Sequence, residues 1–192
     1  MGIDTSMQTI EAVWALLAKA AGARSPYNFL QLASAGLDGA PQVRTVVLRH
    51  CDPAAGTVAF VTDIRSAKVK EIAREPRVAL LGYDGEAMAQ IRMTGEAALV
   101  GDLRQRQAMW AALRGRTHVL FEAPLPPGTP IDAGGVPLSG AGAADGMAPF
   151  ERFALVSVRL TGIDWLDLAA EPHVRCAFRR SEDGWAATRL SP

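Results

Sequence analysis

Short β-type runs separated by turns fill the sequence between Phe29 and Gly101, and this pattern limits the fold more than any other feature. The runs are rich in aliphatic and β-branched residues and are bounded by Gly, Asp and Pro, which favour turns. Strands and helices do not alternate regularly, and neither common glycine-rich phosphate loop is present, which argues against a parallel nucleotide-binding sheet. The pattern is typical of a mainly β fold, an antiparallel β-barrel with flanking helices. Strands are predicted at residues 29–34, 42–49, 57–62, 78–83, 90–100, 153–160, 162–168, 174–180 and 185–190.

Three helices are predicted outside this barrel. Each combines apolar residues at helical spacing with a polar residue that can accept hydrogen bonds from the first-turn N–H groups. They are expected at residues 6–21 with Asp4, Thr5 or Ser6 as N-cap, at residues 67–75 with Ser66 as N-cap, and at residues 103–114.

The chain of 192 residues is long enough to bury a substantial core without disulfides, so we predict a single domain over residues 1–192. A Pro/Gly-rich insertion interrupts it at about residues 122–149. This insertion holds too little apolar mass to form a core element. It is expected either to be flexible or to lie as a flap over a neighbouring surface.

The charges of the chain balance, with 20 basic and 20 acidic residues. No overall field therefore favours nucleic acid or an anionic membrane, and no apolar stretch approaches the roughly 20 residues that span a bilayer. The first residues lack the basic start and apolar run of a signal peptide. Cys51 and Cys176 have no metal-type spacing, and we interpret them as buried reduced thiols. We predict a cytoplasmic protein without a metal site or a nucleic-acid or membrane partner.

Two positions of the predicted barrel carry basic side chains that suit an anion. In the second predicted strand, alternation places Arg44 on the side of Val46 and Leu48, and a barrel-facing Arg is costly unless it pairs with an anion. Lys68 follows Ser66 at a helix start, where N–H groups, a hydroxyl and an ammonium group together form a phosphate site. The simpler interpretations stay open: an edge-strand Arg in solvent, a capping Ser and a solvated Lys.

Several motifs follow one another along the chain at characteristic intervals. They are RTVVLR at residues 44–49, FVTD at 60–63, SAK at 66–68, PRVALL at 76–81, Gln90 before GE at 95–96, then Trp165, His173 and Arg175, and a closing Trp185…Arg189-Leu190-Ser191-Pro192. Together they resemble the pyridoxamine 5′-phosphate oxidase family. The resemblance runs from about Val43 to Pro192 and is lost only in the Pro/Gly-rich insertion.

The resemblance implies an FMN-binding split barrel of the antiparallel Greek-key type, and a homodimer with FMN at its interface. It implies an FMN-dependent oxidoreductase acting on a small-molecule substrate, in which the flavin performs the redox chemistry. Oxygen or a nicotinamide cofactor would be the redox partner, and no catalytic residue is assigned. The implied cofactor-binding residues are Arg44, Thr45, Val46, Val47, Leu48, Arg49, Val61, Thr62, Ser66, Lys68, Gln90, Trp165 and Arg175; the implied substrate-binding residues are Arg49, Trp110, Arg114 and His173.

Within that implied site the residues have different roles. Arg44 and Lys68 would hold the FMN phosphate, and Gln90 would bond the polar end of the ring. Trp165 and Arg175 would come from the partner subunit. Structural alternatives stay open for three residues: Trp165 and Trp110 as core aromatics, and His173, a candidate proton donor, as a turn residue beside Pro172.

Departures from the family pattern concern the substrate side of the site. Ala67 replaces the family's second phosphate-adjacent Arg, and Glu171 replaces the Arg of a substrate-binding Arg–His pair. Trp110 and His118 replace a Tyr and a Ser, while Arg114 is kept, and the family's Gln–Ser pair has no clear counterpart in the insertion. A carboxylate repels a substrate phosphate, so we expect a retained flavin site and a less anionic substrate. The alternatives are a flavin-binding module for FMN or deazaflavin F420 without fast turnover, and a true pyridoxamine 5′-phosphate oxidase.

Overall fold

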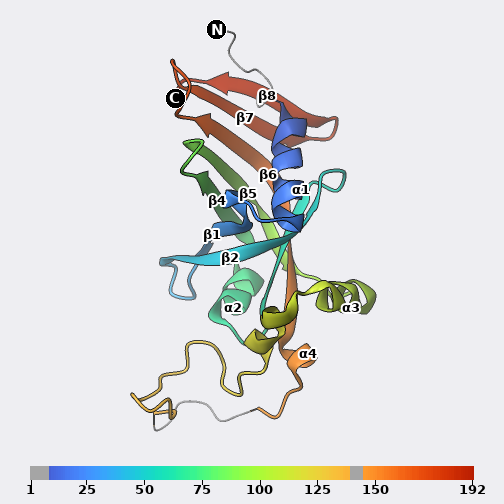
Figure 1. Cartoon of the computed structure of the whole chain (residues 1–192), viewed down its shortest axis with the longest axis vertical. Helices are drawn as coiled ribbons and strands as arrows, with labels where there is room; N and C mark the ends of the chain where they lie inside the picture. Colours follow the sequence, from blue (N-terminus) through green and yellow to red (C-terminus); the bar gives the residue numbers. More distant parts are fainter. Residues whose placement is uncertain (1–8, 139–144) are drawn as a thin grey trace.

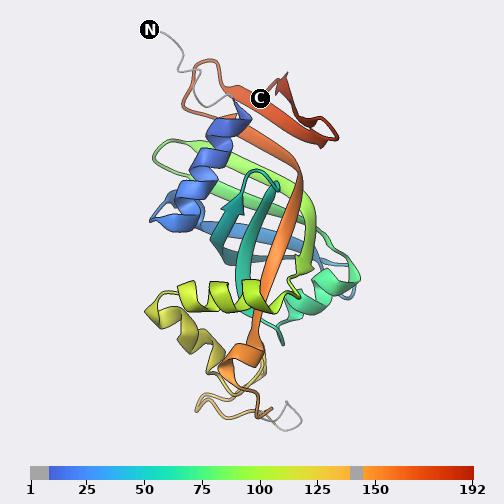
Figure 2. The ribbon, with the colours of Figure 1, turned by 90° about the vertical axis from the view of Figure 1, so that its right-hand side faces the viewer.

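The computed structural model describes residues 9–138 and 145–192 of the chain, and in them all strand pairs of the sheet are antiparallel. Neighbouring strands follow the order β3-β2-β1-β4-β5-β6-β7-β8, and β3 also pairs with β6, which closes the first six strands into a barrel (Figures 1 and 2). The strands are β1 (Phe29–Ala35), β2 (Pro41–Asp52), β3 (Thr57–Asp63), β4 (Arg77–Asp84), β5 (Ala89–Leu99), β6 (Phe153–Asp167), β7 (Val174–Ser181) and β8 (Gly184–Leu190).

The order of the first four strands is that of a Greek key. β1, β2 and β3 form a meander, and β4 then returns to pair with β1 on the side opposite β2. β7 and β8 extend the sheet beyond the barrel at the end of the molecule opposite α3 (Leu103–Ala112) and α4 (Pro149–Arg152) (Figure 1). The prediction of a mainly β, antiparallel barrel with outer helices is confirmed.

One strand prediction is wrong. The strands expected at residues 153–160 and 162–168 are a single strand, β6, whose first half pairs with β3 and whose second half pairs with β7. Gly162 does not end the strand. A Cβ added at this residue would lie 2.8 Å from Arg179 and 3.0 Å from Thr94, so the glycine admits side chains from both neighbouring strands.

The helices pack outside the barrel. α1 (Ile10–Gly22) packs against β2 and contributes Val13, Trp14 and Leu17 to the main core inside the barrel (Figure 2). Its N-cap is Thr9, whose hydroxyl accepts from the N–H of Ala12. The N-caps expected for this helix, Asp4, Thr5 and Ser6, lie outside the described residues. α2 (Ala67–Arg74) and α3 are each close to their predicted ranges, whereas the short elements η2 (Pro26–Asn28), η3 (Gly115–Phe121) and α4 were not expected.

A second, smaller hydrophobic cluster lies on the outer face of β3 and β6. It joins Phe153 and Leu155 of β6 to Phe121 of η3 and Leu113, the residue after α3. This cluster fixes the segment between α3 and the Pro/Gly-rich insertion against the barrel. Among residues 9–138 and 145–192, no helix has both the length and the apolar character needed to cross a membrane.

Gly95 provides a test of the barrel's closure. It lies at a β-bulge where β5 crosses β6, and an added Cβ would come within 2.2 Å of the carbonyl oxygen of Arg159. Because the obstacle is backbone, Gly95→Ala is expected to destabilise the fold by about 1–3 kcal/mol in chemical denaturation. Gly101→Ala is the control, since nothing lies within 4 Å of its added Cβ. Equal stability of the two variants would contradict the close approach of β5 and β6.

Candidate functional site

β2 and β3 separate on one side of the barrel. Their ladder includes the pair Leu48 and Phe60, whereas residues 43–47 of β2 pair only with β1 among the described residues. Residues 61–63 of β3 pair with β6 on their other side. The two facing edges therefore carry backbone N–H and C=O groups without a ladder partner, which a ligand can satisfy. We call these edges, residues 43–47 and 61–63, the β2–β3 split.

The first turn of α2 lies at this split and bonds to β3. Lys68 Nζ donates to Thr62 Oγ1 at 3.0 Å, and the hydroxyls of Thr62 and Ser66 lie 3.3 Å apart. Ser66 occupies the predicted N-cap position, but its side chain makes no capping hydrogen bond. Its hydroxyl joins the polar chain of Thr62 and Lys68 instead. The structure thus brings these three predicted residues together.

On the β2 side of the split, Arg44 makes an ion pair that the sequence did not indicate. Its side chain lies on the same side as the buried Val46 and Leu48, as predicted from strand alternation. Arg44 Nη2 lies 2.6 Å from Glu71 Oε2, and Ser34 Oγ donates to the same oxygen at 2.6 Å. Arg44 Nη1 also donates to Ser34 Oγ. Glu71 is only 4% exposed. Its position on α2, one turn after Lys68, was the sequence feature that could have indicated a place in this site.

Lys68 lies near the positive charge of Arg44, which the nearby carboxylates of Glu71 and Asp63 only partly offset. Burial lowers the pKa of Lys68, Arg44 lowers it further, and Glu71 and Asp63 act in the opposite direction. A group whose charged form is disfavoured in this way gains from an anion placed beside it. The side chains at the split therefore suit an anionic ligand.

Arg49, near the end of β2, and Arg114, which follows α3, form a second pair of basic side chains. Burial, and then the nearby Arg114, lower the pKa of Arg49. Arg49 Nη2 donates to Thr117 Oγ1 at 3.2 Å, while its buried Nε makes no hydrogen bond among the described residues. Neither arginine forms an ion pair with a carboxylate of residues 9–138 or 145–192. Two of the predicted substrate-binding residues are thus brought together, with free capacity for an anion.

Trp110 belongs to the second hydrophobic cluster. Its ring lies 5.3 Å from Phe153, 5.4 Å from Phe121 and 4.5 Å from the imidazole of His118, all between ring centroids. His118 Nε2 lies 3.0 Å from the carbonyl oxygen of Trp110. These contacts support the structural alternative for Trp110, which holds α3 against η3 and thereby positions Thr117 beside Arg49.

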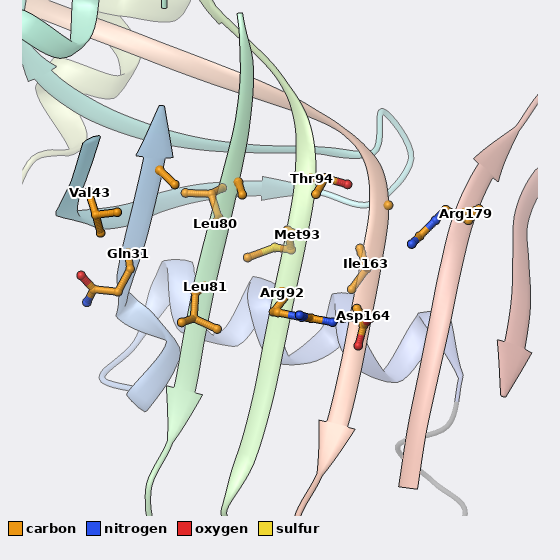
Figure 3. Close-up of a pocket in the computed structure, with 13 residues that line it drawn as sticks. Gln31, Val43, Leu80, Leu81, Arg92, Met93, Thr94, Ile163, Asp164 and Arg179 are labelled. Carbon is orange, nitrogen blue, oxygen red and sulfur yellow. Dashed lines mark hydrogen bonds and ion pairs between the residues drawn. The ribbon is translucent and has the colours of Figure 1, made fainter. Parts of the chain in front are cut away.

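Gln90 and Arg175 lie away from the β2–β3 split, near the start of β5 and the start of β7. Gln90 is opposite Leu166 on β6, and Leu166 is opposite Arg175 on β7, so the three residues are lateral neighbours. Arg175 donates to both oxygens of Asp164, which also pairs with Arg92 at 2.8 Å. Figure 3 shows Arg92 and Asp164 in a cavity of about 450 Å³ on the outer face of the sheet.

Trp165 does not face this surface. Strand alternation turns it to the opposite side from Asp164, and it is 4% exposed within the main core. Trp165 thus lies in the main core of its own chain, and the half-buried Leu166 is the β6 residue beside Gln90 and Arg175.

His173 and Glu171 are exposed in the loop between β6 and β7. This loop lies at the end of the molecule opposite α3, the helix that precedes Arg114 (Figures 1 and 2). A single chain therefore does not bring His173 together with Arg49 and Arg114. The predicted residues form one group at the β2–β3 split and α3, and another at the ends of β5, β6 and β7.

The base of the Pro/Gly-rich insertion is held beside the split by a network that we call the arginine clasp, formed by Asp63, Arg65, Asp145 and Arg152. Arg65 pairs with Asp63 at 2.6 Å and with Asp145 at 2.8 Å. Arg152, which is 6% exposed, pairs with Asp145 at 3.0 Å. The two guanidinium groups also donate to the carbonyl oxygens of Phe121, Glu122, Ala123 and Pro124.

Asp145→Asn is expected to loosen this clasp. Burial raises the pKa of Asp145, but the N–H of Met147 and the guanidinium groups of Arg65 and Arg152 lower it by more, to about 2. A depressed carboxyl pKa stabilises the fold above its ordinary value of 3.8, and this contribution is lost as the pH falls through about 2. The protection factors of residues 121–138 against hydrogen exchange should therefore fall in the variant at neutral pH, and in the wild type between about pH 4 and pH 2. Unchanged exchange beside the control Asp183→Asn would contradict the clasp.

The sequence of this chain is similar to those of several known proteins. A family model described as pyridoxamine 5′-phosphate oxidase, FMN-binding domain, matches residues 11–101. A pyridoxine/pyridoxamine 5′-phosphate oxidase from Nitrobacter winogradskyi is 31% identical over 196 residues, which cover 93% of this chain and 86% of that protein. A dihydrophenazinedicarboxylate synthase from Pseudomonas chlororaphis is 26% identical over 183 residues, covering 93% and 81% of the two chains.

Among solved structures, a pyridoxamine 5′-phosphate oxidase-related, FMN binding protein from Nostoc punctiforme superimposes with a TM-score of 0.76. The two chains are 27% identical, and the match covers 95% of this chain and 96% of the other. The fold is thus the split barrel that the sequence motifs implied.

Proposed function

The chain belongs to the pyridoxamine 5′-phosphate oxidase family of FMN-binding proteins, and on this basis we propose that it is an FMN-dependent oxidoreductase. FMN would supply hydride-transfer chemistry, while the protein binds and orients the flavin and its substrate. The proposal rests on the β2–β3 split, where two strand edges without a ladder partner meet the basic and hydroxyl side chains of α2 and β3.

The residues at the split fit the FMN phosphate. Lys68 and Arg44 supply positive charge, Ser66 and Thr62 supply hydroxyls, and the first turn of α2 supplies N–H groups. The free edge of β2 at Val46 and Val47 offers donors and acceptors of the kind that a flavin ring needs.

We also propose that the protein works as a homodimer with the flavin at its interface. Two observations support this arrangement. The predicted cofactor residues of one chain lie in separate groups, so a complete site needs a second chain. The outer sheet face between them carries apolar side chains around the cavity in Figure 3, among them Leu81 and Val43, which is 66% exposed.

The substrate is proposed to carry an anionic group that pairs with Arg49 and Arg114. Burial, and then the nearby Arg114, lower the pKa of Arg49, and neither arginine has a carboxylate partner in the described residues. Glu171, which argued for a less anionic substrate, lies in the loop between β6 and β7, apart from these two arginines of the same chain. The carboxylates in the name of the Pseudomonas chlororaphis relative make a carboxylate as suitable a candidate as a phosphate.

Turnover by the FMN-loaded protein tests the proposal. Aerobic reaction with pyridoxamine 5′-phosphate, and with reduced aromatic mono- and dicarboxylates, is followed by oxygen consumption and product absorbance. Oxidation of a carboxylate, lost in Arg114→Ala, supports the proposed substrate class, whereas oxidation of pyridoxamine 5′-phosphate alone shows a true oxidase of that vitamer. A bound flavin that no reductant or substrate reduces would favour a flavin-binding module instead.

A further inference from the structure

Glu71 is a buried carboxylate placed directly beside a proposed phosphate site. It lies on α2 three residues after Lys68 and is 4% exposed. Its Oε2 accepts from Arg44 Nη2 and from Ser34 Oγ, each at 2.6 Å, and no described residue donates to Oε1. A carboxylate here is at first sight unfavourable, because it repels a phosphate.

The geometry gives this carboxylate a compensating role. Arg44, Ser34 and Glu71 form a closed triangle, since Arg44 also donates to Ser34 through Nη1. The triangle joins three elements, β1, β2 and α2, and holds a long and otherwise mobile guanidinium in one orientation. Arg44 keeps further N–H donors, and its side chain is 22% exposed, so one side of it stays open to a ligand.

We propose that Glu71 is a positioning residue for the FMN phosphate, acting through Arg44. It orients the guanidinium, and its negative charge at the same time limits how tightly the phosphate binds. The two effects are separable, because a glutamine keeps the acceptor oxygen and removes the charge, whereas an alanine removes both. This inference rests on the proposed FMN site and adds the control of affinity within it.

The test is a fluorescence titration of FMN into the apo forms of the wild type, Glu71→Gln and Glu71→Ala. Glu71→Gln is expected to bind FMN several-fold more tightly, and Glu71→Ala to bind it about 2–10-fold more weakly, as for the loss of one hydrogen-bonded partner. Riboflavin, which lacks the phosphate, should bind equally to the wild type and Glu71→Gln. A merely structural role of Glu71 would change both ligands alike.

The same substitution of Glu71, made in the Arg44→Ala variant, shows whether Glu71 acts through Arg44. In the presence of Arg44→Ala, adding Glu71→Ala is expected to cause no further loss, because no guanidinium is left to orient and a repelling charge is removed. A further loss equal to that in the wild-type background overturns the inference, and so does weaker binding by Glu71→Gln. A wild type that binds neither FMN nor riboflavin overturns the cofactor proposal itself, which distinguishes the two failures.

Discussion

Lys68→Ala is expected to weaken FMN binding by roughly tenfold to a hundredfold, the effect of losing a charge-assisted partner worth about 1.5–3 kcal/mol. Lys68 already donates to Thr62 and lies in a half-buried site where burial and Arg44 lower its pKa. A phosphate dianion favours the protonated ammonium, so binding should weaken as the pH rises through the pKa of Lys68. Isothermal titration of the apo protein with FMN between neutral and alkaline pH measures both effects.

Lys70→Ala is the matched control for this prediction. Lys70 carries the same charge on the same helix, but it is exposed and faces away from the split. Its replacement should leave FMN affinity within about twofold of the wild type, since a distant surface charge contributes little. Similar losses in the two variants would mean that the net charge of the protein, rather than a phosphate contact, governs binding.

Phe153→Ala is expected to lower the free energy of unfolding by about 3–5 kcal/mol, as for other buried aromatic residues cut back to alanine. Phe153 is 0% exposed at the start of β6 and packs against Trp110, Phe121 and Phe150. Its ring therefore joins the barrel to α3, η3 and α4. The cavity left behind should also release Trp110, and with it the segment that holds Thr117 beside Arg49.

Chemical denaturation measures this loss, and near-ultraviolet circular dichroism reports the packing of the tryptophan. Leu103→Ala on α3 is the control, because Leu103 is 53% exposed and its removal creates no cavity. A loss below about 1 kcal/mol in Phe153→Ala would show that the second cluster does not bear on the stability of the barrel.

Local patterns in the sequence were sufficient to predict the fold class and most of the strands. Alternating aliphatic residues and turn residues located the strands, and the order of motifs identified the split barrel. β6 was divided wrongly because Gly162 has the signature of a break, although it serves a close approach of neighbouring strands. The short helices η3 and α4 were missed because side chains from distant segments stabilise them, among them Phe121 and Arg152.

The candidate site was predictable where it depends on one strand or one helix turn. Arg44, Ser66 and Lys68 could be identified from adjacent motifs, and the structure brings them to one place. Glu71 could not be paired with Arg44 from sequence, because the two residues are 27 positions apart and meet only through the sheet. Trp165 was predicted from a motif, and a motif does not show that strand alternation turns Trp165 into the main core and Asp164 and Leu166 to the opposite face.

The visible absorption spectrum of the purified protein, together with the identity of any ligand released by heat, tests the central proposal most directly. The proposal predicts a flavin spectrum, a released ligand that co-migrates with FMN, and about one flavin for each chain of a homodimer. A colourless protein that also takes up no added FMN would contradict it, and would leave Arg44, Lys68 and the β2–β3 split without their proposed ligand.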